Sequence, residues 1–218
     1  MTEPIDPRPR MTDIARLIYA RYLSNAAGGN MSVRVGERVY ITPRFMGSKH
    51  QWNIAPEQIN VVGLDGSPIE GVGDLSRESK AHLAVYRAFS YAGSVIHAHP
   101  RYGSVFAMAG RPIPPTLEYT EKFGTIQVVP PYPSHSAELA EAVVAALQPQ
   151  AYRLEKHGLA LVLAWHGVLA VGRDLDDAYD VLERMEWSAH NLLMGALLER
   201  IPQDPSAWHT RQGESLSR

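Results

Sequence analysis

Two hairpin signals near the start of the chain restrict the type of β-sheet that it can form. The β-type runs "MSVRV" (31–35) and "RVYITP" (38–43) are separated by Gly36-Glu37, a two-residue turn that contains glycine. The segment "INVVGLDGSPIEG" (59–71) repeats this pattern around Asp65-Gly66. Because a hairpin pairs its strands antiparallel, these signals favour a mainly antiparallel or mixed sheet over a parallel one.

Helical patterns alternate with the strand patterns along the rest of the chain. Apolar residues at helical spacing predict helices at 11–24, 76–93, 101–110, 134–148 and 174–201. Apolar runs predict strands at 94–100, within 125–133, and at 159–172, where one bent strand or two strands would fit. Ser76 is a plausible N-cap of the second helix. This alternation predicts an α/β fold with a three-layer α/β/α arrangement around a mainly antiparallel or mixed central sheet.

Composition limits the class of protein and its partners. The 218 residues are 45% hydrophobic and 20% charged, which suits a single domain over 11–202 with flexible tails at 1–10 and 203–218. A net charge of −2 gives no reason to expect nucleic acid or an anionic membrane as a partner. The absence of cysteine excludes thiol nucleophiles, disulfides and thiolate-bound zinc, and fits a cytoplasmic protein.

The segment "SVIHAHPRYGS" (94–104) places two histidines at the end of an apolar strand. Side chains alternate between the two faces of a strand, so His97 and His99 point the same way, and their imidazoles can converge on one metal ion. Two buried neutral histidines with hydrogen-bond partners would also explain the pattern. The spacing therefore indicates a metal site without deciding between these two readings.

A third histidine and a glutamate extend this pattern. His166 lies in the apolar segment "LVLAWHGVLAVG", where burial is costly unless its polar atoms are satisfied. His157 is a competitor, but charged residues flank it. Three histidines without thiolate ligands leave a coordination position open, as in catalytic zinc sites. Glu78 is a candidate acid/base, although a glutamate in a first helical turn also favours the helix dipole.

With these residues in place, the sequence resembles the class II aldolase/adducin family over roughly residues 11–200. The markers "GGNMSVR", "YITP", "SRESKAHLAVYRAF", "VIHAHP" and "WHGVLAVGRDLDDAYDVLE" occur in the family's order. The resemblance implies a zinc ion, or manganese or another divalent metal, held by His97, His99 and His166, with Glu78 as the acid/base. It also implies a homotetramer with active sites between neighbouring subunits, where Tyr119 matches a tyrosine that acts from the adjacent subunit.

The expected substrate-binding loops depart from the family's pattern. Gly29 and Asn30 match the first phosphate-binding loop, whereas Arg44 in the second loop and Arg77, beside Ser76, in the third replace small polar residues. Arginine binds phosphate or carboxylate through a bidentate fork, so we expect these residues to bind an anion. Lys49 and His50 have the pattern of solvated surface groups.

Three functions remain open at this point. The first is an aldolase that cleaves a deoxy- or methylthio-pentulose 1-phosphate through an enediolate, for which Phe45 and Trp52 would provide an apolar end. The second is a metal-dependent decarboxylase of a sugar acid or a dihydroxyaromatic acid on the same scaffold. The third is a non-catalytic, adducin-like assembly module, against which the complete set of three histidines and Glu78 argues.

Overall fold

The structure is a computed structural model that describes residues 5–71 and 73–200. Its helices are α1 (Arg8–Ala20), α2 (Met46–His50), α3 (Ser79–Ala88), α4 (Gly103–Ala109), α5 (Glu118–Glu121), α6 (Ala137–Leu147) and α7 (Leu175–Leu198), with 3-10 segments η1 (Pro56–Gln58) and η2 (Gln148–Glu155). Its strands are β1 (Asn30–Val35), β2 (Arg38–Ile41), β3 (Asn60–Gly63), β4 (Pro68–Glu70), β5 (Ser94–Ala98), β6 (Gln127–Val129), β7 (Leu159–Leu163) and β8 (Gly167–Gly172).

The eight strands form one mixed sheet in the order β4-β3-β2-β1-β5-β8-β7-β6. Both predicted hairpins are present, as the antiparallel pairs β1–β2 and β3–β4. Every neighbouring pair is antiparallel except β6–β7, which is parallel. The apolar segment 159–172 forms two strands, β7 and β8, joined by a tight turn that contains His166.

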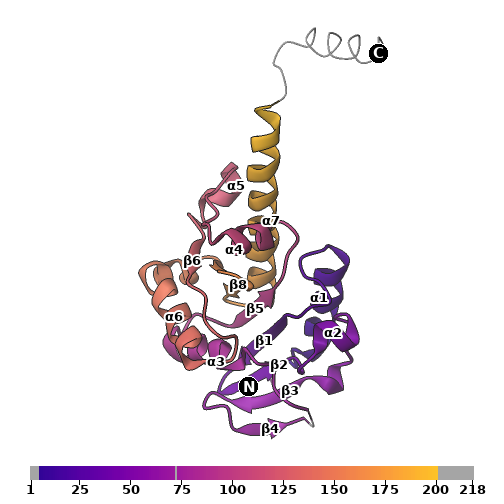
Figure 1. Cartoon of the computed structure of the whole chain (residues 1–218). Helices are drawn as coiled ribbons and strands as arrows, with labels where there is room; N and C mark the ends of the chain where they lie inside the picture. Colours follow the sequence, from indigo (N-terminus) through magenta and orange to yellow (C-terminus); the bar gives the residue numbers. More distant parts are fainter. Residues whose placement is uncertain (1–4, 72, 201–218) are drawn as a thin grey trace, which may run out of the picture.

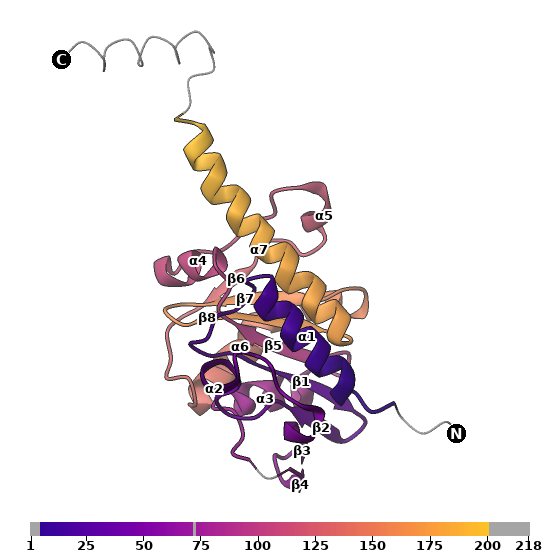
Figure 2. The ribbon, with the colours of Figure 1, turned by 90° about the vertical axis from the view of Figure 1, so that its right-hand side faces the viewer.

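Helices cover both faces of the sheet, which confirms the predicted three-layer arrangement (Figures 1 and 2). Helices α1 and α7 lie on one face, and the ion pairs Arg10–Asp176 and Arg21–Glu183 join them. Helices α3 and α6 pack together on the other face. Strand alternation separates the core in two, since Ile96 and Ala98 face the α1/α7 side while Val95 faces α3 and α6. His97 therefore points toward the side of α3.

Helix α7 is longer than the sheet that it covers. Its first half packs on β8 and β5, and its second half projects beyond the body of the domain beside α5 (Figures 1 and 2). Met194, Leu197 and Leu198 are exposed on this projecting part. Among the described residues, no helix is both long enough and apolar enough to cross a membrane.

Three local expectations were wrong. Helix α1 begins at Arg8, inside the expected tail, because proline is tolerated in a first helical turn and Pro9 occupies that position. Helix α3 has Glu78 rather than Ser76 at its N-cap. The segment 44–58, for which no helix was predicted, contains α2 and η1. Residues 1–4 and the expected tail at 203–218 lie outside the described residues.

Candidate metal centre and catalytic cavity

The sheet brings three histidines together from two regions of the chain. His97 is in β5, His99 follows the end of that strand, and His166 lies in the turn before β8, the strand that pairs with β5. One ligand atom from each of these residues lies within 4.8 Å of the other two. The predicted cluster is therefore present as a geometric arrangement.

The buried nitrogen atoms in this cluster fit a divalent metal. The Nε2 atoms of His97 and His99 are 3.1 Å apart. Nδ1 of His97 lies 2.9 Å from the carbonyl oxygen of Val168, so this nitrogen donates its proton there and leaves a lone pair on Nε2. Nδ1 of His166 is buried without a protein partner. An ion bound at about 2.0–2.1 Å would use such convergent lone pairs.

Burial also keeps these imidazoles neutral. It lowers the pKa of His97 well below the ordinary value, and His166 and His99 lower it further. Burial, and next the proximity of His166, lowers the pKa of His99 to about 4. For His166, burial lowers the pKa while the charge of Glu78 opposes that shift. Neutral imidazole is the form that binds a metal, so the cluster is ready to act as a ligand set at pH 7.

Glu78 extends from the N-terminus of α3 toward the histidines. Its Oε2 atom accepts hydrogen bonds from Nδ2 of Asn30 at 2.6 Å and from Oγ of Ser76 at 3.2 Å. Its Oε1 atom lies 3.6 Å from Nε2 of His166. Since Asn30 is the cross-strand partner of His97, the sheet register and the start of α3 together fix this carboxylate beside the cluster.

Glycines allow the close approach of these side chains. A Cβ atom at Gly167 would lie 2.5 Å from Cδ2 of His99 and 2.6 Å from the carbonyl oxygen of Ala98. At Gly29, where φ is +107°, a Cβ would lie 2.3 Å from the ring of Trp52. Any other residue at Gly167 would push apart the segments that carry the histidines, and any other residue at Gly29 would displace Trp52.

A cavity of about 220 Å³ opens from the histidines to the surface. Its lining includes the residues predicted to bind an anion, namely Gly29, Asn30, Arg44, Ser76 and Arg77. Arg44 forms an ion pair with Asp74 at 3.4 Å, and its Nε atom is buried without a partner. Arg77 is exposed at the cavity wall. The two guanidinium groups give the cavity one cationic side.

Phe45 belongs to this cationic side. Arg44 and Lys49 each lie 4.6 Å from the centroid of its ring, and its φ angle of +66° is in the left-handed region, which is costly for a phenylalanine. Lys49 and His50 do not line the cavity, in agreement with a surface role. Trp52 is fully buried, so it packs in the core and does not provide the apolar end that we expected.

Two other expected or competing residues lie away from the cavity. Tyr119, on α5, is exposed, and Arg184 of α7 lies over its ring at 5.5 Å. Within one chain it does not reach the histidines. His157 packs against Phe123, outside the cluster.

Sequence reasoning missed two polar features near the cluster. Ser134 lines the cavity from the loop that follows β6; a serine shortly after the end of a strand at this edge was a weak signal. His82, one turn after Glu78 on α3, is fully buried and its Nδ1 lies 2.8 Å from Oγ of Ser32. That Oγ is also 2.7 Å from the hydroxyl of Tyr86. The spacing of residues 78, 82 and 86 along one helix face could have indicated this arrangement.

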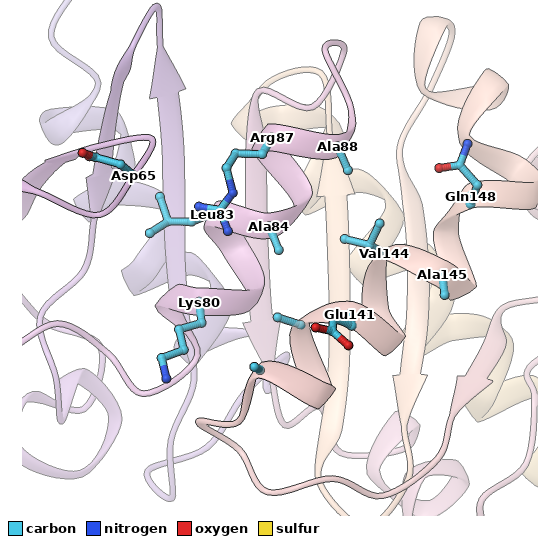
Figure 3. A pocket seen from close by; sticks show the side chains of 12 residues that line it. Asp65, Lys80, Leu83, Ala84, Arg87, Ala88, Glu141, Val144, Ala145 and Gln148 are labelled. Atoms are coloured by element: carbon cyan, nitrogen blue, oxygen red, sulfur yellow. The ribbon is translucent and has the colours of Figure 1, made fainter.

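A larger hollow, of about 680 Å³, lies between α3 and α6 (Figure 3). Ala84 and Val144 line its floor, and Lys80, Arg87 and Glu141 stand around it. It includes none of the clustered histidines, and its lining carries charges of both signs. The chemistry that the residues support is therefore in the smaller cavity.

Comparison with known proteins agrees with this fold. The model of the class II aldolase and adducin N-terminal domain matches residues 9–193. An L-fuculose phosphate aldolase of Methanococcus maripaludis is 29% identical over 188 residues, which are 84% of this chain and 95% of that protein. A 3-oxo-tetronate 4-phosphate decarboxylase of Haemophilus influenzae is 31% identical over 186 residues, which are 82% of this chain and 83% of that protein.

A solved structure has the same fold. The L-fuculose-1-phosphate aldolase from Thermus thermophilus aligns with a TM-score of 0.76 and 26% identity over 91% of this chain and 98% of that one. The α/β domain with one mixed sheet is therefore the fold of class II aldolases. This chain belongs to the class II aldolase and adducin family.

Proposed function

We propose that the protein is a metal-dependent aldolase that cleaves a small ketose 1-phosphate, of the deoxy- or methylthio-pentulose type, to dihydroxyacetone phosphate and an aldehyde. The observation that carries this proposal is the position of Glu78. One carboxylate oxygen is held by Asn30 and Ser76, and the other faces His166 at 3.6 Å, at the inner end of a cavity with a cationic side.

His97, His99 and His166 would hold the metal, for which we propose zinc, with manganese as an alternative. When bound, the ion supplies electrostatic stabilisation to the negative charge that develops on the carbonyl oxygen during bond cleavage. The proposal of zinc rests on the all-nitrogen ligand set, the neutral state of the imidazoles and the absence of thiolates.

Arg44 and Arg77 would bind the anionic end of the substrate, beside the backbone of Gly29. A guanidinium group donates two parallel hydrogen bonds to phosphate, and the unpartnered Nε of Arg44 is available for one of them. This contact would orient the ketose with its carbonyl toward the histidines.

Glu78 would then move one proton. In the cleavage direction, the hydroxyl on C4 loses its proton, the C3–C4 bond breaks, and its electron pair moves toward the C2 carbonyl to give an enediolate. The carboxylate of Glu78 would first take up a proton from water in the open cavity, and Oε1 would then deliver it to C3, which completes dihydroxyacetone phosphate while C4 leaves as the aldehyde carbon. The hydroxyl of Tyr119 from a neighbouring copy would relay the C4 hydroxyl proton to water, which requires the homotetramer that the family resemblance implies.

We also propose a cytoplasmic location, which the cysteine-free sequence supports. A small anionic molecule is the expected partner, and nothing in the charge balance favours nucleic acid. We expect no membrane association.

A decarboxylase is the second candidate, because the pair Arg44 and Arg77 suits a carboxylate as well as a phosphate. In that reaction carbon dioxide would leave in place of the aldehyde, and the same electron pair would move toward the carbonyl. Release of carbon dioxide without an aldehyde product would identify it.

An assay of the metal-replete full chain tests the proposal. Candidate ketose 1-phosphates are supplied, and dihydroxyacetone phosphate is measured with a coupled reductase. Turnover that is lost on chelation and restored by zinc is the expected result. A sample that binds zinc or manganese but releases neither dihydroxyacetone phosphate nor carbon dioxide would refute both reactions. A sample that binds neither metal at neutral pH would support the assembly module.

A further inference from the structure

A second hollow, of about 420 Å³, borders His166. Its lining consists of Ser104, Ala107, Met108, Trp165 and His166. His166 is thus a wall that the hollow shares with the cavity described above. His166 therefore borders both spaces, and a substrate beside it lies next to each of them.

Trp165 makes this hollow apolar. The indole is 82% exposed, and φ of the residue is +60°, in the left-handed region that a tryptophan seldom adopts. Its backbone N–H donates to the carbonyl oxygen of Ala107 at 2.9 Å, which fixes the turn against α4. Met108, from α4, is 67% exposed beside it. A strained residue that presents a large apolar side chain next to a reactive centre is typical of a functional position.

The catalytic cavity itself has no comparable apolar end. Among the described residues, Phe45 is its one aromatic lining residue besides the histidines, and Arg44 and Lys49 lie against that ring. Phe45 therefore belongs to the side of the cavity that suits the anion. An apolar group at the opposite end of a substrate would contact residues of the hollow that also borders His166.

We infer that Trp165 and Met108 form the subsite for the end of the substrate that becomes the aldehyde. This inference rests on the proposed function for the orientation of the substrate, with its anion at Arg44 and Arg77. The part of the lining that the structure describes has a single hydroxyl, on Ser104, so the subsite suits an unhydroxylated methyl or thioether end better than a hydroxymethyl end. Trp165 is then a residue that determines specificity.

Binding measurements test the subsite without any turnover. Two pentitol 1-phosphates that have no carbonyl group and cannot be cleaved, one ending in CH₃ and one in CH₂OH, are titrated calorimetrically into the zinc-replete full chain. We expect the CH₃-ended compound to bind about tenfold more tightly, the size of effect that one small apolar contact gives. Trp165→Ala should abolish this preference and leave the affinity for the CH₂OH-ended compound unchanged, whereas Trp165→Phe should retain most of it.

Trp187→Ala is the matched control, because Trp187 is a second exposed tryptophan that lines neither space beside His166. It should keep the wild-type preference. A Trp165→Ala variant that keeps the preference, or that loses affinity for both compounds equally, would overturn the subsite. So would a variant whose only change is a smaller oligomeric mass, since Trp165 would then serve contact with a second copy. If the protein does not release dihydroxyacetone phosphate from ketose 1-phosphates, that result counts against the proposed aldolase activity but not against the subsite.

Discussion

The two sides of the catalytic cavity are built in different ways. The histidine side comes from paired strands, in which Asn30 faces His97 across the sheet and Gly167 has no room for a methyl group. The cationic side comes from short segments, with Arg44 in a loop and Arg77 exposed before α3. The sheet thus fixes the chemistry, while the loops can change the substrate without disturbing it. Four changes test this contrast, in order of decreasing effect.

Glu78→Gln should have the largest effect. The amide keeps the shape of the side chain but cannot take part in proton transfer, so we expect kcat to fall by about 10²–10⁴-fold. Bound metal, measured by elemental analysis, should stay at the wild-type level. Glu141→Gln, which alters an exposed carboxylate of the hollow between α3 and α6, is the control. Full activity in Glu78→Gln would remove this residue from the mechanism.

Arg44→Ala should weaken substrate binding without touching the histidine side. The loss of one charge-assisted contact costs about 1.5–3 kcal/mol, which corresponds to a rise in KM of roughly ten- to a hundredfold. The thermal midpoint and metal content should not change. Lys49→Ala serves as the control because Lys49 contacts Phe45 but does not line the cavity. If Arg44→Ala loses metal, the two sides are not independent.

Gly167→Ala should destabilise the histidine side of the cavity. The new methyl group would overlap with His99 and with the backbone of β5, so we expect a loss of about 1–3 kcal/mol in the free energy of unfolding. Weaker metal binding should accompany it, which a competing chelator would measure. Gly195→Ala, where a Cβ meets no atom within 4 Å, should be neutral or stabilising. Unchanged metal affinity in Gly167→Ala would refute a sheet-fixed site.

His82 should make the metal-free protein sensitive to acid. Burial lowers its pKa to about 3 from an ordinary 6.5, so on acidification the unfolded chain takes up the proton first. The stability that neutral His82 provides is present above pH 6.5 and is lost as the pH falls toward 3. We expect about 1 kcal/mol of this loss between about pH 6.5 and 5.5.

Urea unfolding of wild type and His82→Gln at both pH values, with chelator present, measures the difference. The difference in the free energy of unfolding between wild type and His82→Gln should become smaller at the lower pH, because glutamine does not titrate. If this difference is the same at both pH values, His82 takes up a proton in the folded state as well. His135→Gln, which alters a histidine outside the three clustered ones, is the control.

The sequence predicted the parts that follow from local pattern. The turn at Gly36 and the alternation around His97 depend on neighbouring residues, so the hairpins and the direction of the imidazoles could be read directly. The choice of His166 over His157 came from the resemblance to the family, because a contact between β5 and β8 has no local signal. Trp52 was misjudged for a similar reason, since its burial depends on packing against Gly29.

The bond from His97 to Val168 has a consequence for how this site tolerates mutation. The acceptor is a peptide carbonyl in β8, so no side-chain replacement can delete it. The tautomer of His97 is set by the alignment of β8 against β5, in which His97 faces Leu169. Only a slip of one strand past the other would break it, and such a slip would also turn the apolar side chains of β8 to the wrong faces. Selection for a stable core thus preserves the proton placement on His97, a proposed metal ligand, at no separate cost.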